Sequence, residues 1–329
     1  MPEDDRISRR TFIHAAGVAV AAASLDGRGL AAPTGGAVPI IDSHIHLFDP
    51  SRPQGVPYKA DPKSPTHTAG AFPPGYRRLA APLGIVGALV VEASPWIEDN
   101  LWVLQACAGH DDMLGVIGNL KPEDPSFPEY LERYGRNPLF RGIRYGNVWD
   151  YDLPSRAKDT AFLERLRLVA QADLVLETAN PRFDLLEAVL RINDAIPELR
   201  MVIDHLPAFE PGPQNQARYD KLLKEFEQRP NVSCKLSAII HRVNGVVSTA
   251  LADHKPRLDL LAGTFGVDRV MFGSDWPNSD ATTSLDRIVA IARAYYADKP
   301  RAAAERYFWR NSARIHKWTP RTSGQPRLA

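Results

Sequence analysis

The sequence predicts a single (β/α)₈ barrel, or TIM barrel, over residues 38–329. Short runs of β-branched and apolar residues alternate with longer stretches of helical periodicity, and eight such runs occur. The runs are apolar along most of their length, which is typical of a parallel sheet buried on both faces. A doubly wound open sheet is the alternative, but it usually carries a glycine-rich phosphate turn after its first strand, and no G-x-G-x-x-G follows the first run.

The predicted strands alternate with helical stretches along most of the chain. The predicted strands are 40–47, 87–93, 113–120, 140–146, 173–179, 200–206, 232–237 and 269–276. The predicted helices are 100–110, 161–170, 183–195, 219–228, 257–265 and 285–296. The connection 48–83 is long and proline-rich, and it starts where barrel active sites lie, so it is predicted to be a lid or binding loop.

Composition narrows the functional classes. Of 329 residues, 44% are hydrophobic and 24% are charged, as in folded globular proteins. With 40 basic and 39 acidic residues the net charge is +1, which counts against binding of nucleic acid or an anionic membrane by overall charge. The partner we expect is a small-molecule substrate. Cys107 and Cys234 can form one disulfide or none, and Cys234 is expected to be a small buried residue.

Residues 1–37 predict a cleavable signal peptide and a flexible linker. Arg9 and Arg10 precede the apolar run 15–25, which is shorter than the roughly 20 residues that a membrane span needs. A small-residue stretch at 30–33 follows, as in a secretory signal. The adjacent arginines are typical of a twin-arginine signal, which exports folded proteins, whereas an ordinary N-terminal helix is the alternative. We therefore expect a periplasmic protein with no stable membrane insertion after cleavage.

Polar side chains interrupt or end three otherwise apolar strands. His44 and His46 lie two residues apart, so their side chains point to the same side of the first strand. His205 comes near the end of the sixth strand and Asp275 near the end of the eighth. In a closed barrel these strand ends ring one mouth, and three imidazoles with a carboxylate suit zinc or a similar divalent ion. A pair of hydrogen-bonded core histidines is the alternative for the first strand.

These motifs resemble the amidohydrolase superfamily. The motifs are Asp-Ser-His-Ile-His-Leu-Phe (42–48), Val-Ile-Asp-His-Leu (202–206), Cys-Lys-Leu-Ser (234–237) and Phe-Gly-Ser-Asp-Trp-Pro (272–277). They are most similar to the amidohydrolase-related branch, which includes lactonases acting on sugar lactones and on pyrone or muconolactone carboxylates. The similarity runs from about Ile40 to Trp318.

The resemblance also bears on the metal. Dinuclear members of the superfamily carry a Lys or Glu on the fourth strand and a His on the fifth, whereas this chain offers Arg144 and Glu177 there. The resemblance therefore implies one divalent ion, with zinc as the first choice, or the same residues working without a metal.

The predicted reaction is hydrolysis of a lactone with a carboxylate- or polyhydroxy-bearing substrate. Asp275 is the predicted general base, alone or on a metal-bound water, and His205 would polarise the carbonyl. The predicted substrate contacts are Arg144, Arg141, Glu92 and Ser94. Arg144 could instead pair with Glu177, and Glu92 with a neighbouring cation. A metal-dependent decarboxylase of the same superfamily and a non-catalytic exported binding protein are the alternative functions.

Four further residues have weaker assignments. Lys235 lies inside the seventh strand and is predicted to form a buried ion pair. His67, His241 and His254 are predicted to lie in loops and are candidate lid contacts.

Export should depend on the arginine pair. Replacing Arg9 and Arg10 with Lys should leave the precursor unprocessed inside the cell, because the twin-arginine receptor reads guanidinium pairs. Immunoblots of cytoplasmic and periplasmic fractions would measure this. Normal processing of the double variant would show that the segment is not a twin-arginine signal.

Overall fold

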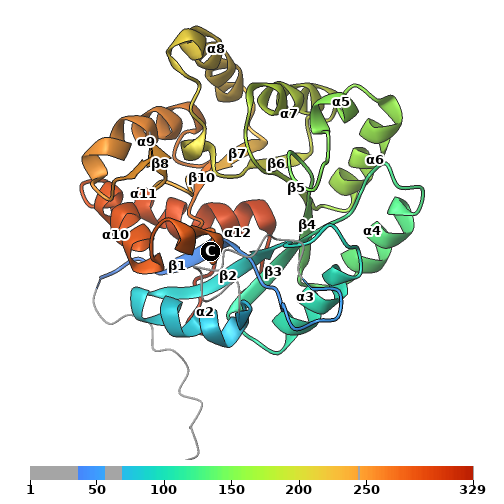
Figure 1. Cartoon of the computed structure of the whole chain (residues 1–329), viewed down its shortest axis with the longest axis horizontal. Helices are drawn as coiled ribbons and strands as arrows, with labels where there is room; N and C mark the ends of the chain where they lie inside the picture. The colour runs from blue at the N-terminus through green and yellow to red at the C-terminus, as the bar shows by residue number, and fades with distance from the viewer. Residues whose placement is uncertain (1–35, 56–68, 244, 329) are drawn as a thin grey trace, which may run out of the picture.

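The computed structural model describes residues 36–55, 69–243 and 245–328, and it contains the predicted barrel (Figure 1). Eight parallel strands follow one another in the order β1-β2-β3-β4-β5-β6-β7-β10. They are β1 (Ile40–Ile45), β2 (Ile85–Val91), β3 (Met113–Gly118), β4 (Phe140–Arg144), β5 (Val175–Thr178), β6 (Arg200–Ile203), β7 (Val232–Lys235) and β10 (Val270–Met271). The predicted signal peptide, apart from its last two residues, lies outside the described part of the chain.

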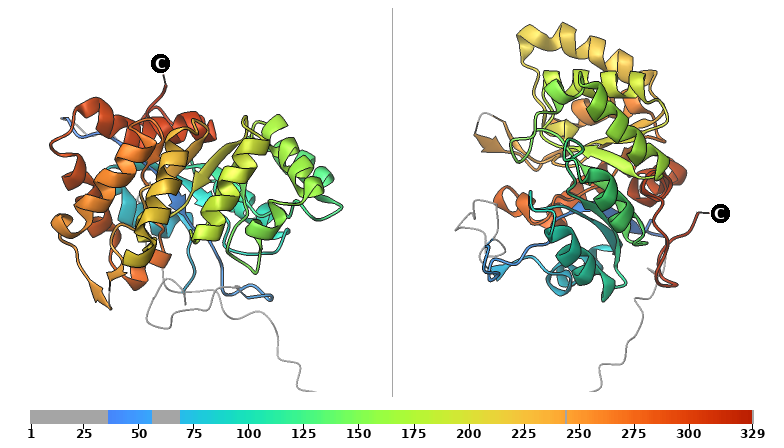
Figure 2. Two further views of the ribbon diagram at one scale, coloured as in Figure 1. Left: turned by 90° about the horizontal axis from the view of Figure 1, so that it is seen from above. Right: turned by 90° about the vertical axis from the view of Figure 1, so that its right-hand side faces the viewer.

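The helices form an outer layer around the strands in all views (Figures 1 and 2). The longer ones are α2 (Pro73–Ala80), α3 (Asp99–Ala108), α4 (Phe127–Gly135), α6 (Thr160–Gln171), α7 (Phe183–Ala195), α8 (Gln216–Glu227), α9 (Leu251–Phe265) and α10 (Leu285–Tyr296). Shorter ones are α5 (Leu153–Arg156), α11 (Arg301–Glu305), the π-helical turn η5 (Arg306–Arg310) and α12 (Asn311–His316). Each longer helix has a side packed toward the barrel; in α7, for example, Leu185, Leu186 and Val189 are buried.

The barrel is closed by backbone hydrogen bonds between the first strand and the segment that follows β10. The amide of Ser43 donates to the Phe272 carbonyl at 3.1 Å, and the amide of Asp275 donates to the His44 carbonyl at 2.9 Å. The amide of His46 then donates to the Trp276 carbonyl at 2.7 Å. The eighth predicted strand, 269–276, is thus regular only at Val270–Met271, but its continuation still pairs with β1.

Two connections differ from the prediction. The connection 48–83 ends in α2 and the short helix η1 (Ala81–Leu83), because Pro73 and Pro74 stand in the first turn, where proline fits a helix. Residues 56–68 of this connection, including His67, lie outside the described part. Helix α9 begins six residues before the predicted start and contains Pro256, so His254 lies in a helix and not in a loop.

The C-terminal helix α12 fills the end of the barrel opposite the mouth, and we call this end the barrel floor. Ile315 of α12 packs with Val175, Val202 and Met271 in a small buried cluster. The Ile315 carbonyl accepts a hydrogen bond at 2.8 Å from Arg200, the first residue of β6. Figure 2 (right) shows the red C-terminal segment on the side opposite the hairpin β8 (Arg242–Val243) and β9 (Val246–Val247).

Both cysteines are free and buried, so the structure has no disulfide between them. Burial raises the pKa of the Cys107 thiol to about 12. In the described ranges, no helix combines the length and apolar character needed to cross a bilayer.

Ile315→Ala tests the barrel floor. Removing this fully enclosed side chain should lower the free energy of unfolding by about 2–5 kcal/mol, because the rigid strands around it cannot collapse into the cavity. Urea unfolding followed by circular dichroism measures the change. Leu79→Ala, at a half-exposed site on α2, is the matched control and should change stability by less than about 1 kcal/mol. Equal losses in the two variants would contradict the proposed floor.

Candidate active site

Four side chains from three strand ends converge at the mouth of the barrel. His44 Nε2 lies 3.2 Å from His46 Nε2, which in turn lies 3.2 Å from Asp275 Oδ1. The same Asp275 oxygen is 3.8 Å from His44 Nε2 and 3.8 Å from His205 Nε2. The structure therefore brings together all four residues that the sequence nominates as ligands.

Two of these residues have a strained backbone. His205 has φ of 56° and Asp275 has φ of 62°, in the left-handed region that non-glycine residues rarely occupy. His205 lies two residues after the end of β6 and Asp275 lies four residues after the end of β10, where the chain turns out of the barrel. Such strain persists only where the surrounding structure holds it, and it concentrates at functional sites.

The ring of His46 is oriented by backbone carbonyls. Its Nδ1 lies 3.0 Å from the Val91 carbonyl and 3.0 Å from the Glu92 carbonyl, so this nitrogen carries the proton and donates. With Nδ1 used in this way, Nε2 is the ring nitrogen that faces the cluster, as in a metal-binding imidazole whose other nitrogen donates to a carbonyl.

His44 can be hydrogen-bonded in two ways. Its Nδ1 lies 3.1 Å from the Lys235 ammonium, which only donates, so the imidazole proton then resides on Nε2 and faces His46. In the other tautomer Nδ1 carries the proton and faces Asp204 Oδ1 at 3.6 Å. Asp204 Oδ1, which also lies 3.1 Å from Lys235 Nζ, is then the acceptor for the tautomer that ligates through Nε2.

The donor set fits one divalent ion. Ligands at ~2.0–2.2 Å from a tetrahedral zinc are about 3.4 Å apart, and the separations of 3.2 and 3.8 Å within the cluster bracket that value. His44, His46 and Asp275 form one group of potential ligands, and His44, Asp204 and His205 form a second. The two groups share His44, whose Nε2 faces His46 and Asp275 and whose Nδ1 faces Asp204.

Burial and mutual electrostatics set the charge of the cluster. Burial lowers the pKa of His44 well below its usual value, and the neighbouring Lys235 cation lowers it further. Burial also lowers the pKa of His205. Burial alone would raise the pKa of Asp275, but its interactions with His205, His46 and His44 outweigh that and hold it well below the usual range. At neutral pH the cluster therefore contains an ionised carboxylate, and the imidazoles of His44 and His205 are neutral.

Comparisons with known proteins bear on this site. The profile of the amidohydrolase family matches residues 41–318, which is most of the chain. The chain belongs to the amidohydrolase family. It is 26% identical over 245 residues to an L-fucono-1,5-lactonase of Burkholderia ambifaria, covering 73% of this chain and 80% of that protein.

Solved structures share the fold. An amidohydrolase from Burkholderia multivorans with bound zinc superposes with a TM-score of 0.73 at 21% identity, covering 85% of this chain and all of that one. A putative 2-pyrone-4,6-dicarboxylic acid hydrolase from Pseudomonas putida has a TM-score of 0.68 at 20% identity, covering 85% and 98% of the two chains.

A buried charged network lies beneath the cluster of this amidohydrolase. Lys235 Nζ is 2.6 Å from Glu177 Oε2 and 3.1 Å from Asp204 Oδ1, which confirms the predicted ion pair. Glu177 Oε1 is 2.7 Å from His316 Nε2 of the C-terminal helix. Glu177 is thus occupied by Lys235 and His316, and the sequence-based alternative that pairs it with Arg144 is wrong.

Arg144 pairs with Glu92 instead. Its Nε donates to Glu92 Oε1 at 2.6 Å, and both side chains are almost fully buried. Ser94 supports the same carboxylate through its amide, at 2.9 Å from Glu92 Oε2. Trp149, which the sequence analysis did not single out, donates its indole N–H to Glu92 Oε2 at 2.8 Å.

Arg141 does not join this group. It is the second residue of β4, near the amino end, whereas Arg144 is the last, so about 10 Å of strand separates them. A Cβ on Gly115 would lie 2.6 Å from Arg141 Cγ, which shows that the Arg141 stem packs against β3. The predicted substrate contact is corrected accordingly: Arg141 is too far down its strand to share a ligand with Arg144.

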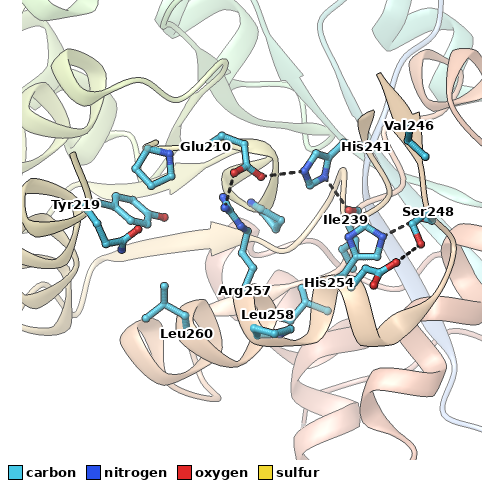
Figure 3. A pocket seen from close by; sticks show the side chains of 15 residues that line it. Glu210, Tyr219, Ile239, His241, Val246, Ser248, His254, Arg257, Leu258 and Leu260 are labelled. Atoms are coloured by element: carbon cyan, nitrogen blue, oxygen red, sulfur yellow. Dashed lines mark hydrogen bonds and ion pairs between the residues drawn. The ribbon is translucent and has the colours of Figure 1, made fainter. Parts of the chain in front are cut away.

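A separate cavity of about 550 Å³ lies between the loops that follow β6 and β7 and helices α8 and α9 (Figure 3). His241 and His254, the candidate lid contacts, both line it. Its polar groups bind mainly one another: Arg257 Nη2 donates to Glu210 Oε2 at 2.9 Å, and His254 Nε2 lies 2.8 Å from the Ser248 carbonyl. None of the four cluster residues lines this cavity.

Gly273→Ala tests the geometry of the cluster. A Cβ at Gly273 would lie 2.8 Å from His44 Cβ, so the substitution should displace His44 and weaken zinc binding about 10- to 100-fold. Zinc titration with a competing chelator measures the affinity. Gly263→Ala, in α9 with open space around it, is the matched control and should bind zinc as the wild type does. Unchanged affinity in Gly273→Ala would contradict a role for His44 in holding the ion.

Proposed function

We propose that this amidohydrolase opens the ring of a lactone with activated water. The observation that carries the proposal is Asp275, a carboxylate kept ionised among three imidazoles at the barrel mouth, with 18% of its side chain exposed. A base held in this way accepts a proton from water only as that water attacks an electrophile. The L-fucono-1,5-lactonase relative and the pyrone hydrolase neighbour support a cyclic ester as the electrophile.

The residues divide the reaction between them. Asp275 takes the proton of the attacking water, whose oxygen bonds to the carbonyl carbon. His205 Nε2, which is 3.8 Å from Asp275 Oδ1, stabilises the carbonyl oxygen as negative charge develops on it. When the ring C–O bond breaks, the proton held by Asp275 passes to the departing alkoxide. The products are the hydroxy acid and the regenerated carboxylate.

The same residues can hold a metal. His44, His46, His205 and Asp275 would bind one divalent ion, with zinc as the first choice. Such an ion supplies Lewis acidity and lowers the pKa of a bound water. The zinc-bound structural neighbour supports this proposal.

The remaining expectations are proposals of the same kind. A metal-dependent decarboxylase would use the same four side chains, but the names of the relatives favour lactone hydrolysis. A non-catalytic binding protein is disfavoured because the charged and imidazole groups needed for water activation are all present. We also propose export to the periplasm, on the arginine pair and the short apolar run of residues 1–37.

Asp275→Asn and His44→Ala test the mechanism together. Asp275→Asn keeps the shape but removes the base, so kcat should fall about 10²–10⁴-fold while KM changes much less. His44→Ala should deplete bound zinc, and excess zinc should restore part of the activity. Lactone hydrolysis with a pH indicator and elemental analysis of each protein provide the readouts. An unchanged kcat in Asp275→Asn would remove the general-base role.

A further inference from the structure

Ser237, the last residue of the Cys-Lys-Leu-Ser motif, contacts the imidazole of His205. The Ser237 Oγ lies 2.8 Å from His205 Nδ1, and Ser237 is 1% exposed. The other ring nitrogen, His205 Nε2, faces Asp275 Oδ1 at 3.8 Å. The serine hydroxyl therefore meets the ring at the nitrogen that does not face the rest of the cluster.

The backbone holds Ser237 in place from both sides. Before it, the Leu236 amide donates to the Met271 carbonyl at 3.0 Å, which pairs this segment with β10. After it, Ala238 has a left-handed φ of 51°, and its carbonyl lies 3.2 Å from Nδ1 of His241. The position of the Ser237 side chain is thus set by the fold, and the direction of its O–H bond is the part that can change.

A serine hydroxyl can donate or accept a hydrogen bond, so it fits both neutral tautomers of His205. When Ser237 donates to Nδ1, the ring proton is on Nε2 and points toward the cluster. When Ser237 accepts from Nδ1–H, Nε2 presents a lone pair instead. His46 differs in this respect, because its Nδ1 faces two backbone carbonyls, which only accept.

The Asp275 carboxylate favours one of these tautomers in the absence of a metal ion. A proton on His205 Nε2 turns the positive end of the N–H bond toward Asp275 Oδ1, whereas a lone pair there would face an anion at 3.8 Å. A cation bound to both Asp275 and His205 reverses this preference, because Nε2 can ligate only through its lone pair.

We infer that Ser237 is a positioning residue for His205 and that its hydroxyl lets His205 change tautomer. The inference rests on the proposed function, in which His205 stabilises the carbonyl oxygen or helps to hold the ion. Without an ion, Ser237 donates to Nδ1 and the Nε2–H of His205 donates to the carbonyl oxygen. With an ion, Ser237 accepts from Nδ1–H and Nε2 is the ligand. The ring carries one proton in both states, so no net charge is gained or lost.

Nitrogen-15 NMR of the His205 ring tests the change of tautomer. In wild-type protein freed of metal with a chelator, we expect the ring proton on Nε2. After equimolar zinc is added, we expect it on Nδ1. The His205→Gln variant assigns the signals. A proton on Nδ1 in the metal-free protein, or one that stays on Nε2 with zinc, would overturn the inference.

Ser237→Ala tests the contact itself. Zinc affinity should fall about 10- to 100-fold, because Nδ1–H of the ligand imidazole loses its acceptor. The kcat for lactone hydrolysis should also fall, with KM nearly unchanged. Zinc titration with a competing chelator and steady-state kinetics measure the two effects.

Ser233→Ala is the matched control for this substitution. It removes another buried serine hydroxyl from β7, four residues before Ser237 and on the same face of the chain. Its zinc affinity and kinetics should match the wild type. Equal zinc affinity in the two alanine variants would overturn the inference.

Ser237→Thr separates the hydrogen bond from packing, because it keeps the hydroxyl. A Cβ built on Gly273 would lie 3.4 Å from Ser237 Cβ, so the glycine leaves space beside this side chain. The threonine variant should recover most of the zinc affinity that Ser237→Ala loses, and a loss as large as that of alanine would contradict a role for the hydroxyl. If thermal melting shows that the threonine variant does not fold, Ser237→Ala and the NMR measurement decide.

The zinc and NMR measurements do not depend on turnover. If both give the expected results while the wild-type protein opens no lactone, the positioning of His205 by Ser237 stands and the proposed function fails. If the protein opens lactones but the zinc affinity of Ser237→Ala is unchanged, the proposed function stands and the inference fails.

Discussion

The site depends on the closure of the barrel between its first and last strands. Three backbone hydrogen bonds, at 2.7–3.1 Å, tie the β1 segment to the segment after β10. One of them runs from the amide of Asp275 to the carbonyl of His44, so closure itself sets two cluster residues side by side. These hydrogen bonds bring together a carboxylate and an imidazole that are 231 positions apart in the sequence.

Charged side chains of opposite sign follow one another from the barrel mouth into its interior. Asp275 is at the mouth among imidazoles, Lys235 lies below His44, and Glu177 lies below Lys235. Each buried ion has a partner within 3.2 Å, which offsets the cost of removing it from water. The Glu92–Arg144 pair repeats this arrangement beside the cluster. Removing Lys235 would leave two buried carboxylates, those of Glu177 and Asp204, without this cation.

The sequence predicts the fold because its apolar runs recur at regular intervals. It predicts the cluster because polar residues at the ends of those runs break the apolar pattern. Apolar runs separated by helical stretches identify the eight strands, and a histidine or aspartate at the end of such a run stands out against it. Asp204 also ends the apolar run of β6, directly before His205. Periodicity alone does not show which of these two adjacent polar residues belongs to the site. Helix α9 starts at Leu251, six residues before the predicted start at residue 257, and Pro256 lies inside it.

Other features depend on contacts that no local pattern encodes. Trp149 lies in an irregular loop, and its hydrogen bond is made to a carboxylate 57 positions earlier in the sequence. The partner of Arg144 is decided by which carboxylate the barrel brings to it, and Glu92 and Glu177 are equally plausible on the sequence. The left-handed backbone of His205 and Asp275 is likewise a property of the assembled mouth.

The C-terminal helix α12 supports the catalytic cluster from inside the barrel. Ile315 completes the barrel floor and His316 holds Glu177, so the charged layers under the catalytic cluster acquire their last member from almost the final segment of the polypeptide. During synthesis, the strands that carry the histidines leave the ribosome long before this helix does. A nascent or truncated chain that ends before residue 316 therefore has its mouth residues but not the foundation that fixes them. The support beneath the reaction centre therefore depends on a segment that follows every strand of the barrel in the sequence.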